Sequence, residues 1–137
     1  MNNEKSFEEI VEEIVQKDPR YKAESYSFVM SALGFTQNKL KRNGHVSGDE
    51  LLKGIQNVAL ELFGPMARTV FEHWGIYKTE DFGHIVFNMV NSGLMGKTDS
   101  DSIDDFKDIY DFKKVFDEAP FPKINLKSTT KKLSCKI

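Results

Sequence analysis

Four polar side chains recur at helical spacing between residues 80 and 92, and they are the first candidates for chemistry in this sequence: Asp81, His84, Asn88 and Asn91. An asparagine on an exposed helix face can read an adenine edge, as in a DNA recognition helix. However, residues 79–93 contain no Lys or Arg, and neutralisation of phosphates by basic side chains supplies most non-specific affinity for nucleic acid. We therefore interpret the four residues as a solvated polar face that contacts a protein partner.

A run of acidic residues follows this segment: Asp99, Asp101, Asp104 and Asp105. An EF-hand loop starting at Asp99 requires Gly at its sixth position and an acidic residue at its twelfth. The chain has Asp104 and Tyr110 there, which excludes that loop. Weak binding of Ca²⁺ or Mg²⁺ by several carboxylates stays open. We interpret the run as a negatively charged surface that repels a duplex and belongs to the same partner-binding region.

The sequence lacks the usual catalytic and metal-binding patterns. No two of its histidines, His45, His73 and His84, have the i, i+4 spacing of two ligands on one helix face, and no His-Glu-x-x-His motif occurs. Cys135 is the single cysteine, so an internal disulfide is excluded, and no fixed base is expected beside it. We predict no catalytic residue, metal or cofactor. A small enzyme or metal-binding protein that uses His73 or His84 with carboxylates is kept as an alternative.

Charge is distributed unevenly along the 137 residues, although the formal net charge is only −2. Residues 119–137 contain five Lys and no acidic residue, so the rest of the chain holds 14 basic against 21 acidic residues, a net charge of −7. Such asymmetry is informative about partners rather than about fold. Nucleic-acid binding through basic residues is therefore the second functional hypothesis. Its candidate contacts are Lys39, Lys41, Arg42, Lys123, Lys127, Lys131 and Lys132.

Hydrophobic periodicity and capping residues predict the helices that position these side chains. Ser6 with Glu9, and Ser47 with Glu50, are capping-box pairs at the starts of helices at about 7–17 and from 48 onward. Asp18-Pro19 is read as the start of a second helix, with Gly34 as a candidate break within it. Gly64-Pro65 ends the third helix and begins a fourth, which Gly75 ends. Thr79 caps a fifth helix, with Gly93 and Leu94 just beyond its end.

A β-hairpin is predicted beyond this fifth helix. Phe106, Asp108, Tyr110 and Phe112 alternate as a strand does, and a short helix at about 112–118, capped by Asp111, follows. A helix followed by a helix and a hairpin is the order of a winged helix-turn-helix. We predict a mainly α (α+β) fold with a winged-helix-like centre, one globular domain over residues 1–118, and a basic, flexible tail over 119–137.

Seven short segments between Asp18 and Phe116 form a specific combination. They are Asp18-Pro19-Arg20-Tyr21, Tyr26-Ser27-Phe28-Val29, His45-Val46-Ser47-Gly48, Phe63-Gly64-Pro65-Met66-Ala67-Arg68, Trp74-Gly75-Ile76, Asp81-Phe82-Gly83 with Ile85-Val86-Phe87, and Asp105-Phe106 through Tyr110-Asp111-Phe112. By these residues the chain resembles a small family of uncharacterised bacterial proteins, described chiefly from planctomycetes and verrucomicrobia. The resemblance covers 99 residues. It implies no activity and assigns no functional residue.

No apolar run approaches the roughly 20 residues of a membrane span, and Met1–Ile10 are too polar and acidic for a signal peptide. We therefore expect a cytoplasmic protein. The predicted function is a non-enzymatic interaction module that binds a protein partner through the acidic hairpin or the polar helix face. The sequence leaves the oligomeric state open.

Overall fold

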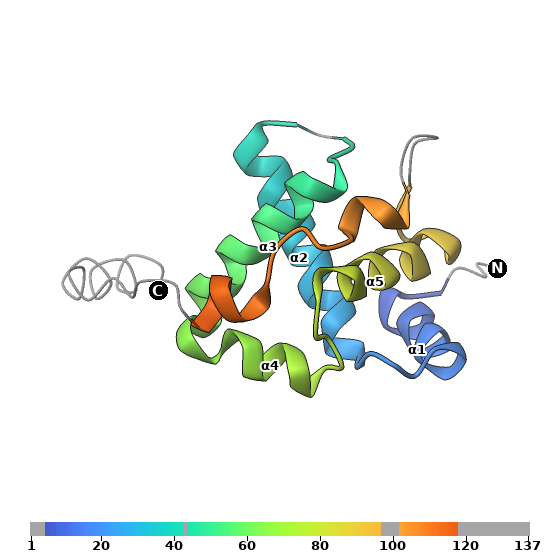
Figure 1. Ribbon diagram of the computed structural model, residues 1–137. Helices are drawn as coiled ribbons and strands as arrows, with labels where there is room; N and C mark the ends of the chain where they lie inside the picture. The colour runs from blue at the N-terminus through green and yellow to red at the C-terminus, as the bar shows by residue number, and fades with distance from the viewer. Residues whose placement is uncertain (1–4, 43, 97–101, 118–137) are drawn as a thin grey trace.

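The computed structural model describes residues 5–42, 44–96 and 102–117, and this part of the chain is mainly helical (Figure 1). The five α-helices are α1 (Phe7–Lys17), α2 (Ala23–Leu40), α3 (Gly48–Phe63), α4 (Ala67–His73) and α5 (Thr79–Asn91). Three short helical turns complete it: η1 (Gly64–Met66), η2 (Ile103–Phe106) and η3 (Lys113–Asp117). The predicted tail at 119–137 lies outside the described residues.

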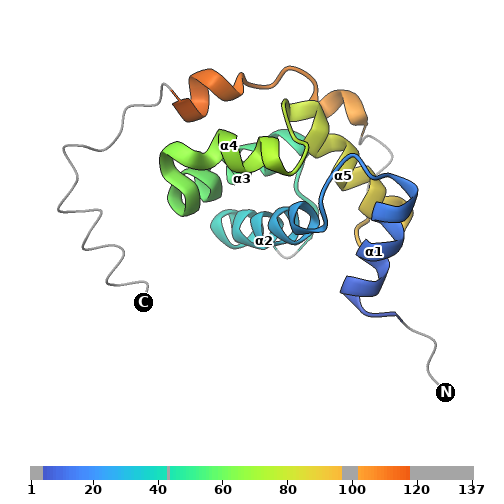
Figure 2. The same ribbon diagram turned by 90° about the horizontal axis from the view of Figure 1, so that it is seen from below.

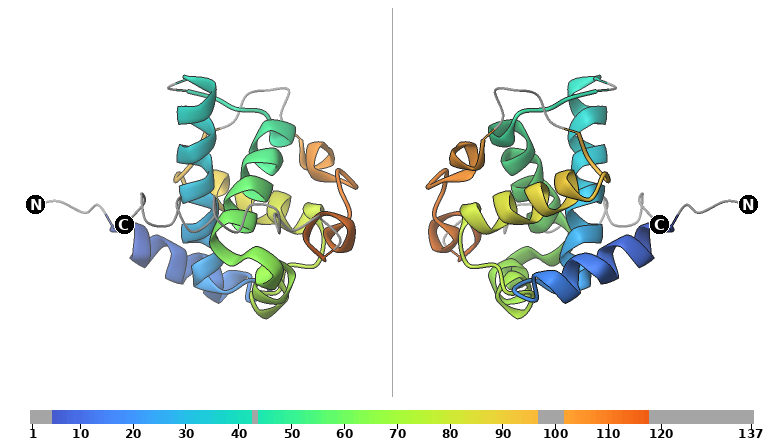
Figure 3. Two further views of the ribbon diagram at one scale, coloured as in Figure 1. Left: turned by 90° about the vertical axis from the view of Figure 1, so that its left-hand side faces the viewer. Right: turned by 90° about the vertical axis from the view of Figure 1, so that its right-hand side faces the viewer.

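Helix α5 is enclosed on several sides, because α1, α2, α3 and η2 all pack against it. Residues 102–117 cross α3, α4 and α5 on the side that faces away from α2 (Figure 2). The two views of Figure 3 show α1 at one end of α5, beside the start of α2. The chain thus surrounds α5 with elements from both ends of the sequence.

An aromatic cluster fills the core between α2, α4, α5 and η3. Phe71 is fully buried at its centre, and its ring centroid lies 5.1 Å from that of Phe82 and 5.4 Å from that of Phe116. Phe28 and Trp74 extend the cluster, with centroids 5.5 Å apart. Such edge and tilted contacts add about 0.5–1.5 kcal/mol per pair beyond the burial of apolar area. This cluster ties the C-terminal segment to the helices.

Both predicted capping boxes are confirmed. The amide of Glu9 donates to Ser6 Oγ (3.1 Å), and the Ser6 amide donates to Glu9 Oε1 (2.8 Å). Ser47 and Glu50 make the same pair of bonds at 3.1 and 2.9 Å. Each box satisfies two backbone N–H groups that a helix start otherwise leaves unpaired. These local bonds need only the sequence around them, which explains why the starts of α1 and α3 are predictable.

The predicted start of the second helix at Asp18-Pro19 is wrong. Asp18 ends α1, its amide donating to Ile14 O (2.8 Å), and α2 begins only at Ala23. The linker is held by tertiary contacts instead, since Tyr21 is buried and the Lys22 amide donates to Trp74 O (3.1 Å). A break at Gly34 is also wrong, because α2 continues to Leu40. A solvent-facing glycine costs a helix only about 1 kcal/mol, which the buried face of α2 offsets.

The predicted β-hairpin, and with it the winged helix, is not supported, because residues 102–117 contain helical turns and no strand. The alternating apolar residues face different neighbours. Phe106 packs against Gly83 of α5, where a Cβ atom would lie 2.9 Å from the Phe106 ring. Tyr110 donates to Leu52 O of α3 (2.7 Å), and Phe112 enters the aromatic cluster. Of the polar turn predicted at 98–103, residues 98–101 lie outside the described residues, and Ile103 begins η2.

Two smaller predictions concern caps. Asp111 does cap η3, because its Oδ1 accepts the Lys113 amide (2.8 Å). The predicted end of this helix at Glu118 lies outside the described residues.

The prediction that Thr79 caps α5 is wrong. Its buried hydroxyl instead donates to Phe106 O (2.5 Å) and accepts the Ile109 amide (3.2 Å), fastening the C-terminal segment to α5.

Candidate functional site

An apolar groove of about 420 Å³ opens between α2, the start of α3, the C-terminal half of α5, and η2. Helix α5 contributes Val86, Phe87 and Val90 to its wall. The other apolar lining residues are Leu33 of α2, Val46 and Leu51 at the start of α3, Leu94 and Met95 after α5, and Phe106 of η2. We call this concavity the apolar groove. Its size and lining are those of ligand-binding sites in general.

The groove exists because α5 has apolar residues on more than one face. Phe82, Ile85 and Met89 are completely buried in the core, whereas Val86 and Val90 are only partly buried beside the groove. The helical period of the sequence predicts Val86 and Val90 among the inward residues of the helix. Six of the nine residues from 82 to 90 are apolar, so the apolar surface of this helix is wider than packing against a single core requires. This wide apolar surface is the signal in the sequence that could have predicted an apolar groove.

The end of α5 shapes one edge of the groove. Gly93 takes the left-handed conformation (φ 83°), which favours glycine. This turn lets the Leu94 amide donate to Met89 O (2.9 Å), so the chain folds back over the last turn of the helix. Leu94 and Met95 are thereby placed against the groove as partly buried apolar side chains. The prediction that Gly93 and Leu94 end this helix is confirmed.

Polar side chains at the rim bind the protein's own backbone. Gln37 Nε2 donates to Gly44 O (2.9 Å), Ser47 caps α3, and Asp105 Oδ2 accepts the Ser102 amide (3.0 Å). These bonds fix the rim in place. They leave the wall between them formed by apolar side chains.

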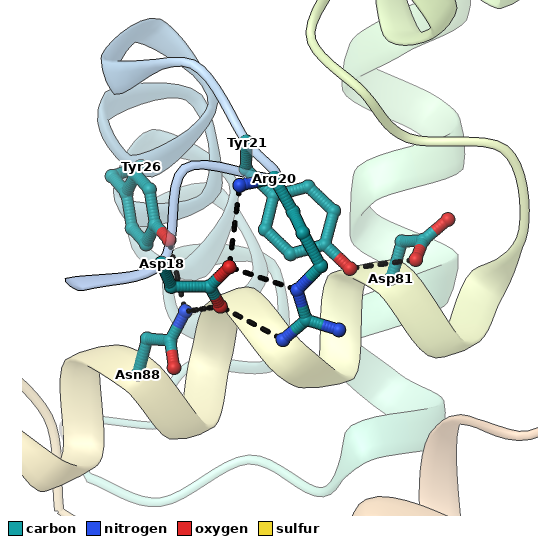
Figure 4. A network of polar contacts seen from close by, with 6 residues as sticks. All are labelled: Asp18, Arg20, Tyr21, Tyr26, Asp81 and Asn88. Atoms are coloured by element: carbon teal, nitrogen blue, oxygen red, sulfur yellow. Dashed lines mark hydrogen bonds and ion pairs between the residues drawn. The ribbon is translucent and has the colours of Figure 1, made fainter. Parts of the chain in front are cut away.

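Two of the predicted partner-binding residues, Asp81 and Asn88, take part in a polar network that joins α5 to the linker before α2 (Figure 4). Tyr21 donates its hydroxyl proton to Asp81 Oδ1 (2.6 Å), and the amides of Tyr77 and Lys78 donate to Oδ2 (2.8 and 3.2 Å). Asp81 is only 9% exposed. Its carboxylate therefore holds together three parts of the fold.

Asn88 occupies the other end of this network. Its Nδ2 lies 2.9 Å from Asp18 Oδ2 and 3.0 Å from the Tyr26 hydroxyl oxygen, and it donates to both. Arg20 binds the same carboxylate through Nε and Nη2, each at 2.8 Å. The interpretation of α5 as carrying a solvated polar face is thus wrong at Asp81 and Asn88. The linker and α2 cover these two residues. Their side chains therefore act in holding the fold together rather than in contacting a partner.

The pKa of the Asp18 carboxyl lies far below its usual range, chiefly because the Arg20 side chain donates to it, with Asn88 and the Arg20 amide adding further bonds. A carboxyl whose pKa is lower in the folded state stabilises the fold above its unfolded pKa of about 4, and this contribution is lost as the pH falls toward the folded pKa.

We therefore expect Asp18→Asn to lower the free energy of unfolding by about 1–2 kcal/mol at pH 7, a modest value because Arg20 is half exposed. The difference between wild type and variant should shrink as the pH falls from 5 to 2. Urea denaturation of wild type and variant at several pH values measures the loss of stability at pH 7 and its decrease at lower pH. A difference that stays constant over this range would show that Asp18 acts through packing and not through its charge.

The other candidate partner-binding residues do not form one surface with these. Asn91 and Asp104 are exposed, His84 is half-buried, and Asp105 lines the apolar groove. Asp99 and Asp101 lie outside the described residues. Among the described candidates, Asp105 is the one that lines the apolar groove.

The basic residues predicted to contact nucleic acid are exposed at the C-terminal end of α2, as expected for a solvent-facing charge cluster. Arg42 is paired with Glu50 through Nη1 (2.6 Å), and Lys39 lies 5.9 Å above the Phe35 ring. Lys41 adopts a left-handed backbone conformation (φ 57°). Lys123, Lys127, Lys131 and Lys132 lie outside the described residues, so the alternative of nucleic-acid binding stays a prediction.

The metal-binding alternative gains no site from the described residues. His73 is exposed at the end of α4, and His84 lies on α5. Within residues 5–42, 44–96 and 102–117, no three His, Cys, Asp or Glu side chains converge as ligands for an ion.

Comparison of the chain with family models, with curated proteins and with solved structures finds no match. The resemblance given by the segments from Asp18 to Phe116 therefore stays a prediction. None of the helices in the described part of the chain combines the length and apolarity that crossing a membrane requires.

Proposed function

We propose that this chain is a non-enzymatic interaction module that binds a protein partner, and that the apolar groove receives apolar side chains of that partner. The observation that carries the proposal is the wall of α5, where Val86, Phe87 and Val90 stay partly exposed in a concave surface. An apolar side chain that enters such a site gains about 1.5–3 kcal/mol from its burial. A few such side chains carry most of the energy of a protein interface.

The shape of the groove favours a segment of polypeptide over a polar metabolite. Two of its walls are helices, α2 and α5, and helix-lined apolar grooves commonly bind the apolar face of an amphipathic helix. The rim residues Gln37, Ser47 and Asp105 already form hydrogen bonds with backbone groups. These three side chains therefore have little hydrogen-bonding capacity left to recognise a polar small molecule. Met95, a flexible side chain at the edge, allows the groove to adapt to different apolar residues.

A peptide library displayed on phage and selected against the immobilised full chain tests the proposal. Selection should enrich peptides with two or three large apolar residues at helical spacing. Binding of a selected peptide, measured by fluorescence anisotropy, should weaken at least tenfold in Val90→Arg, because the introduced side chain fills the groove and holds a charge there. Leu94→Arg, placed beyond the end of α5, should have the same effect.

The matched control is Leu62→Arg, which introduces the same charge at an apolar residue that is 65% exposed and lies outside the groove lining. It should leave peptide binding unchanged. Circular dichroism and thermal unfolding show whether each variant is folded. The proposal is wrong if no peptide is enriched, or if folded groove variants bind the selected peptide as tightly as Leu62→Arg does.

A further inference from the structure

We infer that the partner segment bound in the apolar groove is an amphipathic helix with oppositely charged flanks, acidic beside the C-terminal end of α2 and basic beside η2. This inference rests on the proposed function, because a partner must first enter the groove. It specifies the charge pattern of that partner and the direction in which its helix lies. Three observations support it: the cation that continues the α2 wall, the carboxylate on the opposite wall, and the apolar residues between them.

The α2 wall of the groove ends in exposed basic side chains. Gln37 lines the groove, and Lys41, the C-cap of α2, follows it by four residues, so it lies one turn further along the same side of the helix. Gln37 Nε2 donates to Gly44 O (2.9 Å), which folds the chain after Lys41 back against the groove. Lys41 is exposed, while Arg42 beside it is paired with Glu50. This end of the groove is therefore positively charged and accessible.

The opposite wall carries a carboxylate. Asp105 of η2 is the acidic residue among the described residues that line the groove. Its Oδ2 accepts the Ser102 amide (3.0 Å), which fixes the side chain. A carboxylate has about four acceptor positions, so Asp105 can also accept a lysine or arginine donor. Figure 3 shows η2 and the C-terminal end of α2 on opposite sides of the start of α3, so the two charges lie beside opposite flanks of a helix bound between them.

Apolar side chains lie between these two charged walls. Val86, Phe87 and Val90 of α5 are partly buried there. The ring centroids of Phe87 and Phe106 lie 6.4 Å apart, so the apolar surface continues to η2. A segment bound over these residues has one apolar face covered and a polar flank at each wall. An amphipathic helix provides this arrangement, because its flanks lie on either side of its apolar stripe.

The two charges also determine the direction of the bound helix. Turning an amphipathic helix end for end in the groove exchanges its flanks, although its apolar face stays buried. A helix with acidic residues on one flank and basic residues on the other therefore meets Lys41 and Asp105 with complementary charges in one direction and with like charges in the other. Apolar burial favours both directions equally, and charge complementarity selects between them.

A nucleic acid is a poorer match for the same two walls. Its phosphates would be attracted by Lys41 but repelled by Asp105, and Glu50 already takes up part of the positive charge of Arg42. A segment that carries both signs of charge is complementary to both walls, and a polypeptide helix can carry both.

A helical peptide library with a fixed apolar face tests the inference. Its members keep leucines at helical spacing, and the positions on the two flanks vary between lysine, glutamate and alanine. Displayed on phage and selected at low salt against the immobilised full chain, the library should enrich peptides with glutamate on one flank and lysine on the other. Against Lys41→Glu, the first flank should change to lysine while the second stays lysine. Against Asp105→Asn, the preference on the second flank should disappear.

The affinity of a selected peptide gives the size of the effect. A single exposed ion pair changes an equilibrium by up to about fivefold, and reversal of one charge adds repulsion to that loss. Fluorescence anisotropy should therefore show that Lys41→Glu weakens binding about fivefold or more at low salt, and that the difference shrinks as salt is added.

Lys17→Glu is the matched control. It makes the same change of charge at an exposed residue of α1, and none of the described residues that line the groove comes from that helix. It should alter the preference on neither flank. Lys41→Gln removes the charge without reversing it and should abolish the preference on the first flank, which keeps the test decisive if circular dichroism shows that Lys41→Glu is unfolded.

The outcomes separate this inference from the proposed function. Enrichment of apolar helices with no preference on either flank would overturn the inference and leave the groove as a partner site. Failure of every peptide to bind would overturn the proposed function and the inference with it. A flank preference that is the same against wild type and Lys41→Glu would also overturn the inference. Loss of binding of a labelled single-stranded RNA in Lys41→Glu, without any flank preference among the peptides, would assign Lys41 to nucleic acid instead.

Discussion

Replacing Gly75 with alanine should lower the free energy of unfolding by about 3 kcal/mol or more. Gly75 has φ 91°, a conformation that costs a residue with a Cβ atom about 1–2 kcal/mol. The added Cβ atom would also lie 2.1 Å from the carbonyl oxygen of Arg20. Overpacking of this kind costs about 1–3 kcal/mol more, because a backbone group cannot rotate aside.

The surroundings of Gly75 prevent the structure from relaxing around the new methyl group. The Lys22 amide donates to Trp74 O, Tyr21 is buried beside the linker, and Arg20 is fixed to Asp18. Moving the Arg20 carbonyl would therefore disturb the junction of α1, α2 and α5 together. The substitution tests whether the linker at residues 18–22 and the corner at residues 74–76 are packed as tightly as the structure shows.

Gly34→Ala is the matched control. Apart from its chain neighbours and the adjacent backbone of its own helix, no heavy atom lies within 4 Å of the position its Cβ would take, and the residue is exposed inside α2. Because alanine favours the helix over glycine, this variant should be about 0.5–1 kcal/mol more stable than wild type. Urea denaturation followed by circular dichroism measures both. If Gly75→Ala unfolded within about 1 kcal/mol of wild type, the close packing of the two segments would be refuted.

The sequence predicted those parts of the fold that depend on local bonds. Ser6 with Glu9, Ser47 with Glu50, and Gly93 with Leu94 each mark a helix end through groups only a few residues apart. The same local signals misled where tertiary contacts decide the outcome. Asp18-Pro19 has the composition of a helix start, but Asp18 is bound by Arg20 and Asn88, and Tyr21 turns into the core.

Residues 102–117 show even more clearly that local sequence signals fail where tertiary contacts decide the structure. Phe106 and Phe112 alternate with polar residues as in a strand, yet each is buried against a different helix, and the backbone between them turns through Asp108, a non-glycine residue with φ 52°. Alternation indicates which side chains are buried but not whether a second strand is present to pair with. In the described residues no such strand exists, so helices supply the contacts instead.

The candidate site was harder to predict than the fold. A helical period assigns Asp81 and Asn88 to the face opposite the core, and it assigns Val86 and Val90 to the core. The structure covers the two polar residues and leaves the two valines only partly buried, because α5 is enclosed by elements on several sides. The polar residues Asp81 and Asn88 on α5 bind the linker. Apolar residues near the C-terminal end of α5 face a groove that none of the described residues fills. A helix with neighbours all around has no single inward face, so its period alone cannot separate core from site.

Asp81→Asn should lower the free energy of unfolding by about 2–3 kcal/mol, although the two side chains have almost the same shape. Asp81 accepts three hydrogen bonds through both carboxylate oxygens, from the Tyr21 hydroxyl and from the amides of Tyr77 and Lys78. An asparagine offers only one oxygen, so its NH₂ group must face either the Tyr21 hydroxyl or the two amides. At a buried position, a donor left without an acceptor costs about 1–3 kcal/mol.

A double-mutant cycle with Tyr21→Phe identifies which bonds carry this cost. Tyr21→Phe alone removes one donor and should cost about 1–1.5 kcal/mol, since Asp81 keeps its two amide partners. In Asp81→Asn, the Tyr21 hydroxyl can rotate to donate elsewhere, whereas the amides of Tyr77 and Lys78 are fixed at the start of α5. The asparagine should therefore turn its oxygen to the amides and its NH₂ group to Tyr21, and the effects of the two substitutions should fall short of additivity by about 1 kcal/mol or more. Strict additivity, measured by urea denaturation of the four proteins, would show that Tyr21 and Asp81 do not share a bond, and that Tyr21 contributes to the linker's packing on α5 only through burial of its ring.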